Sequence, residues 1–346
     1  MRRQFGAKPR KEDLEKYTRS NNWQVNKFQN LEDTSMNINI QDLPKLLYKQ
    51  FCQKQGREPE KPIPIEPFDK ADFLKESSDS KLIWYGHSVL LLRLNSKTIL
   101  IDPMFGQDAA PISPFGIKRF SNDTLNIIDD LPEIDLALIS HDHYDHLDLN
   151  SIQKLIPKVR KFGMALGVAR HLKKWGVPEN KMVELDWWED LNFNDIKITF
   201  TPTRHFSGRG LMDRSRSLWG GWVLRTPKEN IWFSGDSGYG NHFKEIGERL
   251  GPFDFGIMEC GQYNEKWHQI HMYPEESIQA ALDVGLKKIM AVHWAGFALA
   301  QHHWKDPIRR FISAAAGTSL KLSHPKPGEI FTVKQLKDHS WWEAFK

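Results

Sequence analysis

The stretch Leu136–Asn150 reads LALISHDHYDHLDLN and places three histidines and three aspartates directly behind an apolar run. A continuous apolar run is typical of a strand that is buried on both faces. Ionisable side chains that follow such a strand lie together at one edge of the sheet, where open α/β folds build their sites. The stretch therefore predicts a core strand that delivers a polar cluster to a functional site.

The polar cluster has the composition of a metal site. His141 and His143 are two residues apart, so in an extended segment their side chains point the same way. Asp145 and His146 follow at the turn into the next predicted helix. Imidazole and carboxylate groups suit borderline divalent metals such as zinc, and one catalytic zinc needs about three protein ligands. Since four candidates exceed that need, we predict two metals that share the segment.

Three further candidates follow later strands. His205 lies in TPTRHFSGRG, Asp236 in FSGDSGYG and His293 in AVHWAGF, each next to the end of an expected strand. Asp236 stands between glycine and serine, so its carboxylate is a candidate bridge between two metals. The predicted ligand set is His141, His143 and His205 for one ion and Asp145, His146 and His293 for the other, with Asp236 and a hydroxide between them.

The rest of the chain divides into an extension and a β-rich body. Residues 1–75 are polar and contain the proline-rich REPEKPIPIEPF, so we expect an N-terminal extension with one or two short helices, packed on the body. In residues 76–346 hairpins such as SLWGGWVLRT–NIWFSGDSG alternate with β–α–β patterns. This mixture predicts an α/β fold of two sheets with helices outside them.

Composition and charge limit the functional classes. Hydrophobic residues make up 40% and charged residues 27% of the 346 residues, and no apolar run approaches the roughly 20 residues of a membrane span. Cys52 and Cys260 stand apart, so neither a disulfide framework nor a thiolate zinc site is expected, and a cytoplasmic location is predicted.

Residues 1–70 carry 14 Lys and Arg against 10 Asp and Glu, whereas the remainder carries 34 of each. This excess is either a solvated extension or a peripheral contact with the inner membrane face. Since no basic block is interleaved with aromatics, nucleic acid is not an expected partner.

The motifs resemble those of a known family. HDHYDH is similar to the H-x-H-x-D-H signature of the metallo-β-lactamase superfamily, and His205, Asp236 and His293 match its later metal-binding motifs in order. The resemblance covers about residues 80–335. It implies a four-layer αβ/βα sandwich with the site at one edge.

A narrower resemblance extends beyond the ligands. LIWYGHSVLLLRL, ILIDPMF, SLWGGWVL and the long stretch from GDSGYG to HWAGFALA look like the branch of phospholipases D that hydrolyse N-acylphosphatidylethanolamine. This resemblance implies a two-zinc phosphodiesterase in which a metal-bridging hydroxide attacks phosphorus. It also implies a phospholipid or small phosphodiester as substrate. Iron and manganese remain open, because the same nitrogen and oxygen ligands serve all three metals. The oligomeric state also remains open.

Further residues are assigned roles around the metals. Asp145, Asp236 and His271 are the predicted catalytic residues, and the branch places a histidine at the position of His271 beside its metals. Such a histidine would protonate the leaving oxygen or stabilise the phosphoryl group, and a surface loop is the alternative. Arg209 is a predicted substrate-binding residue because a guanidinium binds two phosphate oxygens, and His303, which follows the last ligand loop, is a second.

Two early residues receive supporting roles. His87, in WYGHS, is expected to be a hydrogen-bonded core histidine rather than a ligand. Asp102, in LIDP, is expected to fix the orientation of a ligating histidine. Two other functions stay open: a lactonase or esterase of small substrates, with or without a phosphate group, and a non-catalytic metal-binding scaffold.

Overall fold

The computed structural model describes residues 3–37, 41, 43–52, 55–110, 116–210 and 212–346. Within these ranges the helices are α1 (Lys11–Tyr17), α2 (Leu43–Cys52), α3 (Lys70–Leu74), α4 (Thr124–Asp130), α5 (Leu149–Leu155), α6 (Ala169–Trp175), α7 (His242–Leu250), α8 (Pro274–Asp283) and α9 (Asp306–Ala315). The strands are β1 (Trp23–Gln24), β2 (Lys27–Phe28), β3 (Lys81–Trp84), β4 (Leu90–Leu94), β5 (Lys97–Ile101), β6 (Ile134–Ile139), β7 (Val159–Ala165), β8 (Met182–Leu185), β9 (Asp190–Phe193), β10 (Ile196–Thr201), β11 (Gly221–Arg225), β12 (Asn230–Phe233), β13 (Phe255–Glu259), β14 (Lys288–Val292), β15 (Lys321–Ser323) and β16 (Phe331–Thr332).

Two mixed sheets make up the body of the described chain. The first has the order β16-β3-β4-β5-β6-β7-β8 and the second the order β15-β14-β13-β12-β11-β10-β9. In each sheet one half is antiparallel and the other half, β5 to β8 or β12 to β15, is parallel. Parallel neighbours need crossover connections, and α4–α6 and α7–α9 supply them.

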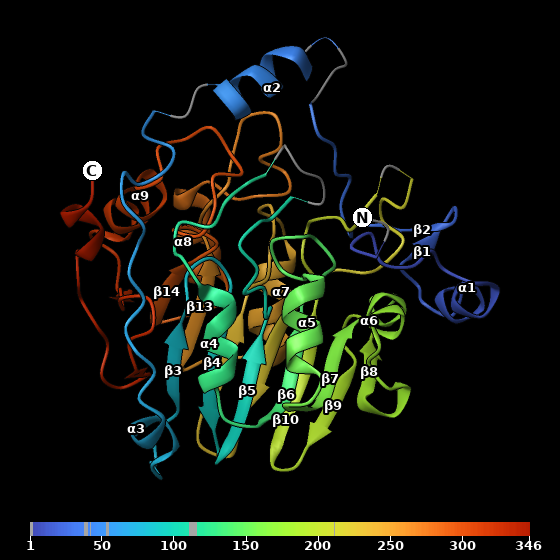
Figure 1. Cartoon of the computed structure of the whole chain (residues 1–346), viewed down its shortest axis with the longest axis horizontal. Coiled ribbons are helices and arrows are strands. Elements are labelled where there is room, and N and C mark those ends of the chain that lie inside the picture. The colour runs from blue at the N-terminus through green and yellow to red at the C-terminus, as the bar shows by residue number, and fades with distance from the viewer. Residues whose placement is uncertain (1–2, 38–40, 42, 53–54, 111–115, 211) are drawn as a thin grey trace.

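The helices lie on the outer faces of the two sheets. Figure 1 shows α4, α5 and α6 in front of the first sheet, with the second sheet behind it and α7, α8 and α9 beyond that. The inner faces of the sheets pack on each other, so most strand residues are buried on both sides. The layers are helix, sheet, sheet and helix, which confirms the predicted four-layer αβ/βα sandwich.

Local sequence explains where the crossover helices begin and end. Asp148 caps α5 by accepting a hydrogen bond from the Ser151 N–H, and Glu276 reaches back to the Tyr273 N–H at the start of α8. Gly176 ends α6 with a φ of +104°, a conformation that costs other residues strain. These ends place the loops that precede the helices at the carboxyl edge of each sheet.

A tight turn divides the apolar stretch LIWYGHSVLLLRLN. The stretch forms β3 and β4, and His87 in the turn between them has a φ of +55°. A second turn at Asn95 and Ser96 joins β4 to β5, with both residues at positive φ. The early break moves His87 out of the sheet and toward the polar cluster.

The N-terminal segment follows the surface of the sandwich. Asn30 exchanges two hydrogen bonds with the His205 backbone, at 2.8 and 3.0 Å. The Ile63 N–H donates to the Phe120 carbonyl oxygen, and Figure 1 shows α2 above the edge of the sheets where the polar cluster lies. None of the helices among the described residues is both long and apolar enough to cross a membrane.

Candidate metal centre

All seven predicted metal ligands meet at one edge of the sandwich. His141, His143, Asp145 and His146 follow β6 of the first sheet. The second sheet supplies His205 after β10, Asp236 after β12 and His293 after β14. The chain thus uses strand ends from both sheets to build one cluster, as the sequence pattern predicts.

The first ligand group consists of three imidazoles. His141 Nε2 lies 3.0 Å from His143 Nδ1, and His205 Nε2 lies 3.2 Å from the same atom. Two ligands bound tetrahedrally to one ion at about 2.1 Å would be about 3.4 Å apart. The three nitrogens are therefore spaced as neighbouring ligands of a single metal ion.

The second ligand group combines two imidazoles and a carboxylate. Asp145 Oδ2 lies 3.4 Å from His146 Nε2 and 3.3 Å from His293 Nε2. These distances also match neighbouring ligands of one metal ion. His87 joins this group through Nε2, which is 2.8 Å from Asp145 Oδ2.

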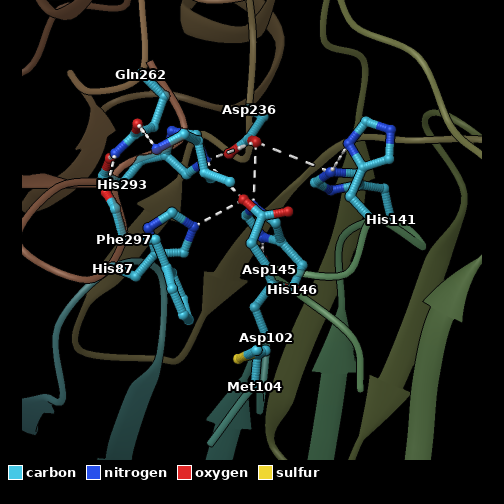
Figure 2. Close-up of polar contacts among 12 residues, drawn as sticks. His87, Asp102, Met104, His141, Asp145, His146, Asp236, Gln262, His293 and Phe297 are labelled. Carbon is cyan, nitrogen blue, oxygen red and sulfur yellow. Dashed lines mark hydrogen bonds and ion pairs between the residues drawn. The ribbon is translucent and has the colours of Figure 1, made fainter. Parts of the chain in front are cut away.

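Asp236 stands between the two groups. Its Oδ2 lies 3.0 Å from His293 Nε2 and 3.1 Å from His146 Nε2 on one side, and 3.8 Å from His141 Nε2 on the other. Figure 2 shows this carboxylate between the His293 side and the His141 side of the cluster. Within the described residues Asp236 Oδ1 is buried without a hydrogen bond, and His146 Nε2 makes none of acceptable geometry despite its short contact with Asp236. Buried polar atoms without a hydrogen-bond partner are rare, and a metal ion bound between these two atoms would satisfy both.

The ring nitrogens that face away from the cluster have acceptors of their own. His146 Nδ1 lies 2.7 Å from Asp102 Oδ2, as the sequence predicts for Asp102. His205 Nδ1 lies 2.9 Å from the Ile270 carbonyl oxygen. His293 Nδ1 lies 3.4 Å from the Gly261 carbonyl oxygen and 3.5 Å from Glu259 Oε1. Such outer contacts fix the tautomer that turns a lone pair toward a metal.

The electrostatics divide the imidazoles into two kinds. Burial, with the neighbouring imidazoles, holds the pKa of His141 and His205 well below the usual value, and burial lowers that of His143 to about 4. Burial also acts to lower the pKa of His146 and His293, but the surrounding carboxylates outweigh it and raise both. The first group therefore holds neutral imidazoles, whose lone pairs can bind a cation. In the second group the negative charge of the carboxylates outweighs the effect of burial on the imidazoles.

Glu259 is a functional candidate that the sequence reasoning missed. It is fully buried at the end of β13, and its Oε1 makes a short hydrogen bond with His271 Nδ1. Its Oε2 accepts a hydrogen bond of 2.6 Å from the Ser237 N–H, next to Asp236. Glu259 therefore positions the predicted catalytic histidine and one predicted ligand, His293, at the same time. An acidic residue at a strand end in FGIMECG was the available signal.

Replacing Glu259 by glutamine tests this role. A glutamine side chain has the same volume but only one oxygen, so it cannot accept hydrogen bonds from both the Ser237 N–H and His271 Nδ1. We therefore expect His271 and His293 to lose their fixed orientation. Metal affinity and turnover should each fall about 10- to 100-fold, the usual effect of losing an outer-shell partner. Competition with a chromophoric chelator and steady-state assays measure the two quantities. Unchanged values for both, with the fold intact by circular dichroism, would remove Glu259 from the site.

His87 is held in a strained turn beside the cluster. The His87 N–H donates to the Trp294 carbonyl oxygen and the His293 N–H donates to the His87 carbonyl oxygen, each at 2.9 Å. His87, His293 and Ala295 all have positive φ, between +53° and +65°. Strained backbone of this kind persists where the surroundings over-determine it, often at functional sites. The predicted core histidine thus contacts Asp145 directly and ties the turn after β3 to the loop after β14.

The structure places Arg209 away from the cluster. Its guanidinium is buried and donates to the carbonyl oxygens of Asp142 (2.6 Å), Leu147 (2.7 Å) and Gln4 (2.9 and 3.2 Å). It also lies over the Tyr144 ring at 3.9 Å. Because its donors are taken up by backbone oxygens, this placement does not support the predicted contact with a substrate phosphate.

His303 also lies outside the cluster. Its Nδ1 accepts a hydrogen bond of 3.2 Å from the Lys305 N–H, and its ring lies beside Gly56 of the N-terminal segment. The neighbouring His302 Nε2 accepts from the Gln262 N–H at 3.0 Å. His303 therefore contacts the extension rather than the space above the ligands, and the predicted substrate contact is not made here.

A pocket of about 230 Å³ opens over the predicted ligands. His143, Asp145, Asp236 and His293 lie at its base, and His271 and Gln262 lie beside them. Its apolar wall consists of Met36, Phe206, Trp267, Ile270 and Leu299. Met36 belongs to the N-terminal segment, so the segment contributes to the pocket itself.

Known proteins resemble the chain in sequence. A family model described as "Beta-lactamase superfamily domain" matches residues 97–294. An uncharacterized protein of Mycobacterium tuberculosis is 34% identical over 329 residues, which cover 93% of this chain and 87% of that protein. The N-acyl-phosphatidylethanolamine-hydrolyzing phospholipase D 1 of Caenorhabditis elegans is 31% identical over 269 residues, covering 73% of this chain and 75% of that protein.

Solved structures show the same fold. The metallo hydrolase Igni18 from Ignicoccus hospitalis matches with a TM-score of 0.57 and 19% identity, over 74% of this chain and 98% of that chain. The family match covers more than half of the chain and includes all seven predicted ligands. The chain belongs to the beta-lactamase superfamily, and N-acyl-phosphatidylethanolamine-hydrolyzing phospholipase D is among its homologues.

Proposed function

We propose that this metallo-β-lactamase-fold hydrolase binds two zinc ions and cleaves a phosphodiester, with an N-acylphosphatidylethanolamine-type phospholipid as substrate. The observation that carries the proposal is Asp236, which lies between two ligand groups of metal-like spacing at the base of a pocket. The homology to the Caenorhabditis elegans phospholipase D supports the choice of bond. Residues 1–75 are proposed as an extension and residues 76–346 as the hydrolase domain.

The ligand set would serve a two-metal hydrolysis. Two bound zinc ions would supply Lewis acidity for the phosphoryl oxygens and lower the pKa of a coordinated water. His141, His143 and His205 would hold one ion, and Asp145, His146 and His293 the other. Asp236 would contact both. Asp102 and Glu259 would keep their histidines in the ligating tautomer.

His271 is proposed as the proton donor to the leaving oxygen. It lines the pocket, and its Nδ1 is engaged by Glu259, which leaves Nε2 as the other ring nitrogen. A carboxylate behind a histidine fixes the ring so that the second nitrogen can exchange a proton with a substrate. The leaving N-acylethanolamine oxygen needs one proton when its bond to phosphorus breaks, and in this proposal His271 supplies it.

The pocket fits a headgroup better than a whole lipid. At about 230 Å³ it is small, and its side walls are apolar while its base is polar. A phosphodiester would sit over the ligands with acyl chains extending past Met36 and Leu299 toward the surface. We further propose that the N-terminal segment, whose Met36 reaches this wall, brings the pocket to a membrane surface.

Zinc-loaded protein incubated with N-acylphosphatidylethanolamine in mixed micelles tests the function. Equal amounts of phosphatidic acid and N-acylethanolamine, identified by mass spectrometry, are expected. A lactone panel and bis-p-nitrophenyl phosphate run in parallel separate the alternatives. Activity on lactones without release of either lipid product would indicate a lactonase, and the absence of all three activities would favour a metal-binding scaffold.

A further inference from the structure

We propose that residues 3–7, termed the N-terminal strap, are a brace that positions the metal-binding loop, defined as residues 141–147. Two buried side chains, His171 and Arg209, transmit the contact. The inference rests on the proposed metal site but is independent of its substrate. Neither His171 nor Arg209 contacts the predicted ligands, so both are positioning residues.

The first connection runs through His171. The Ala7 N–H donates to His171 Nδ1 at 3.0 Å, and His171 Nε2 lies 3.1 Å from Asp142 Oδ2. Because Nδ1 is an acceptor, the proton of the neutral ring is on Nε2 and is donated to Asp142. Burial keeps this ring neutral by lowering its pKa to about 3. The strap thus selects the tautomer that holds Asp142.

Asp142 transmits this contact to the ligands. It stands between His141 and His143 in the sequence, and its buried carboxylate also accepts from the Gly208 N–H at 2.7 Å and from the Ser217 hydroxyl. Its direction away from the pocket forces the side chains on either side of it to face the cluster, since neighbours in an extended segment alternate. Loosening Asp142 would therefore loosen two ligands at once.

The second connection runs through Arg209. Its Nε and Nη2 donate to the Gln4 carbonyl oxygen, at 3.2 and 2.9 Å. Its Nη1 donates to the carbonyl oxygens of Asp142 and Leu147, near the two ends of the metal-binding loop. A buried guanidinium whose acceptors are removed is costly, because its charge has been taken out of water. The strap therefore completes the acceptors that hold Arg209 against the loop.

The strap is held against α6 by hydrogen bonds. The Trp175 indole N–H donates to the Arg3 carbonyl oxygen at 2.8 Å, and Arg170 Nε donates to the Ala7 carbonyl oxygen at 2.9 Å. Gly6 is buried with a φ of +68°, and an added Cβ would overlap His171 Nδ1. Gly6 is thus the point at which the strap has no room for a side chain.

The substitution Gly6→Ala tests the brace, with Gly285→Ala as its matched control. Gly285 has a φ of +80°, and an added Cβ there would meet no described atom within 4 Å, so both variants share the backbone strain but not the overlap. We expect Gly6→Ala to weaken zinc binding about 10- to 100-fold, as the loss of an outer-shell partner does, and Gly285→Ala to leave it unchanged. Chelator competition measures both affinities. Equal affinities in the two variants would overturn the proposal.

Hydrogen exchange on the unaltered chain gives an independent test. Coupling between two sites is reciprocal, so zinc should slow exchange of the Ala7 amide, which donates to His171. Zinc stabilises the whole fold, so the reference is the Ile63 amide, which donates to the Phe120 carbonyl oxygen elsewhere in the N-terminal segment. A strap that served stability alone would show no more slowing at Ala7 than at Ile63, and that result would overturn the proposal even if Gly6→Ala did not fold. If the unaltered chain bound no zinc, the proposed function itself would fail. Zinc binding without slowed exchange would refute the brace and leave the proposed function standing.

Discussion

Asp236→Asn should abolish most of the hydrolysis and lower the metal content of the protein. Asp236 Oδ2 lies within 3.0–3.9 Å of four histidine nitrogens that belong to both ligand groups. An amide keeps the shape but removes the negative charge and can turn a hydrogen-bond donor toward a cation. Turnover should therefore fall by more than the roughly 10- to 100-fold that an outer-shell change costs. Steady-state kinetics and elemental analysis of bound metal measure the two effects.

Asp195→Asn is the control for this change. Asp195 is exposed in the turn between β9 and β10, outside the predicted metal groups. It should keep full metal content and full turnover. If Asp236→Asn were to retain the zinc content and turnover of the control, a metal bridge at Asp236 would be wrong.

Removal of the metal should have the second large effect. In the cluster, imidazole nitrogens and buried carboxylates face one another at 3.0–3.4 Å, and a bound cation would offset the negative charge of Asp145 and Asp236. A ligand that binds the folded state stabilises it by about 2.7 kcal/mol at 100 times its Kd and about 4.1 kcal/mol at 1,000 times. Dialysis against a chelator should therefore remove activity and lower the Tm by several degrees.

Titration of metals back into the apoprotein extends this test. Activity and Tm should rise together with free zinc, and parallel titrations with manganese and iron(II) identify which ion restores most turnover. In Asp236→Asn the rise in Tm should be smaller at each zinc concentration. A fully demetallated protein that kept its activity and Tm would contradict the proposed metal centre.

The predicted ligands are the part of the site that the sequence indicates best. Each stands beside an apolar run that is recognisable as a strand, and strands that run in the same direction within a sheet end at the same edge. This holds also for β10 and β12, which are both antiparallel to β11. The position of Asp102 follows from the same rule, since it comes directly after β5 and reaches His146. Short-range pattern was sufficient because the chemistry is attached to the regular elements.

Residues whose role depends on distant contacts were harder to predict. His87 lies in a turn with positive φ that forms backbone hydrogen bonds with the loop after β14. No local sequence pattern predicts that long-range pairing. Arg209 is a predicted phosphate-binding residue in the sequence, yet the N-terminal segment covers it and supplies an acceptor at Gln4. The ring of His303 likewise packs against the extension, beside Gly56. The extension is therefore the element whose course the sequence left undetermined.

Each proposed metal position takes ligands from both sheets, and this sets a mechanical condition on the protein interior. His205 of the second sheet must lie close to His141 and His143 of the first. The distance between these ligands therefore depends on the thickness of the apolar layer between the two sheets. Gly163 lies in this layer, where a Cβ would meet Leu138 of its own sheet and Leu191 of the other. Interiors packed at crystal-like density transmit such a change in volume instead of absorbing it. We therefore expect substitutions of core residues far from any ligand to change which metal ion is preferred, because a wider or narrower interior favours ions of a different radius.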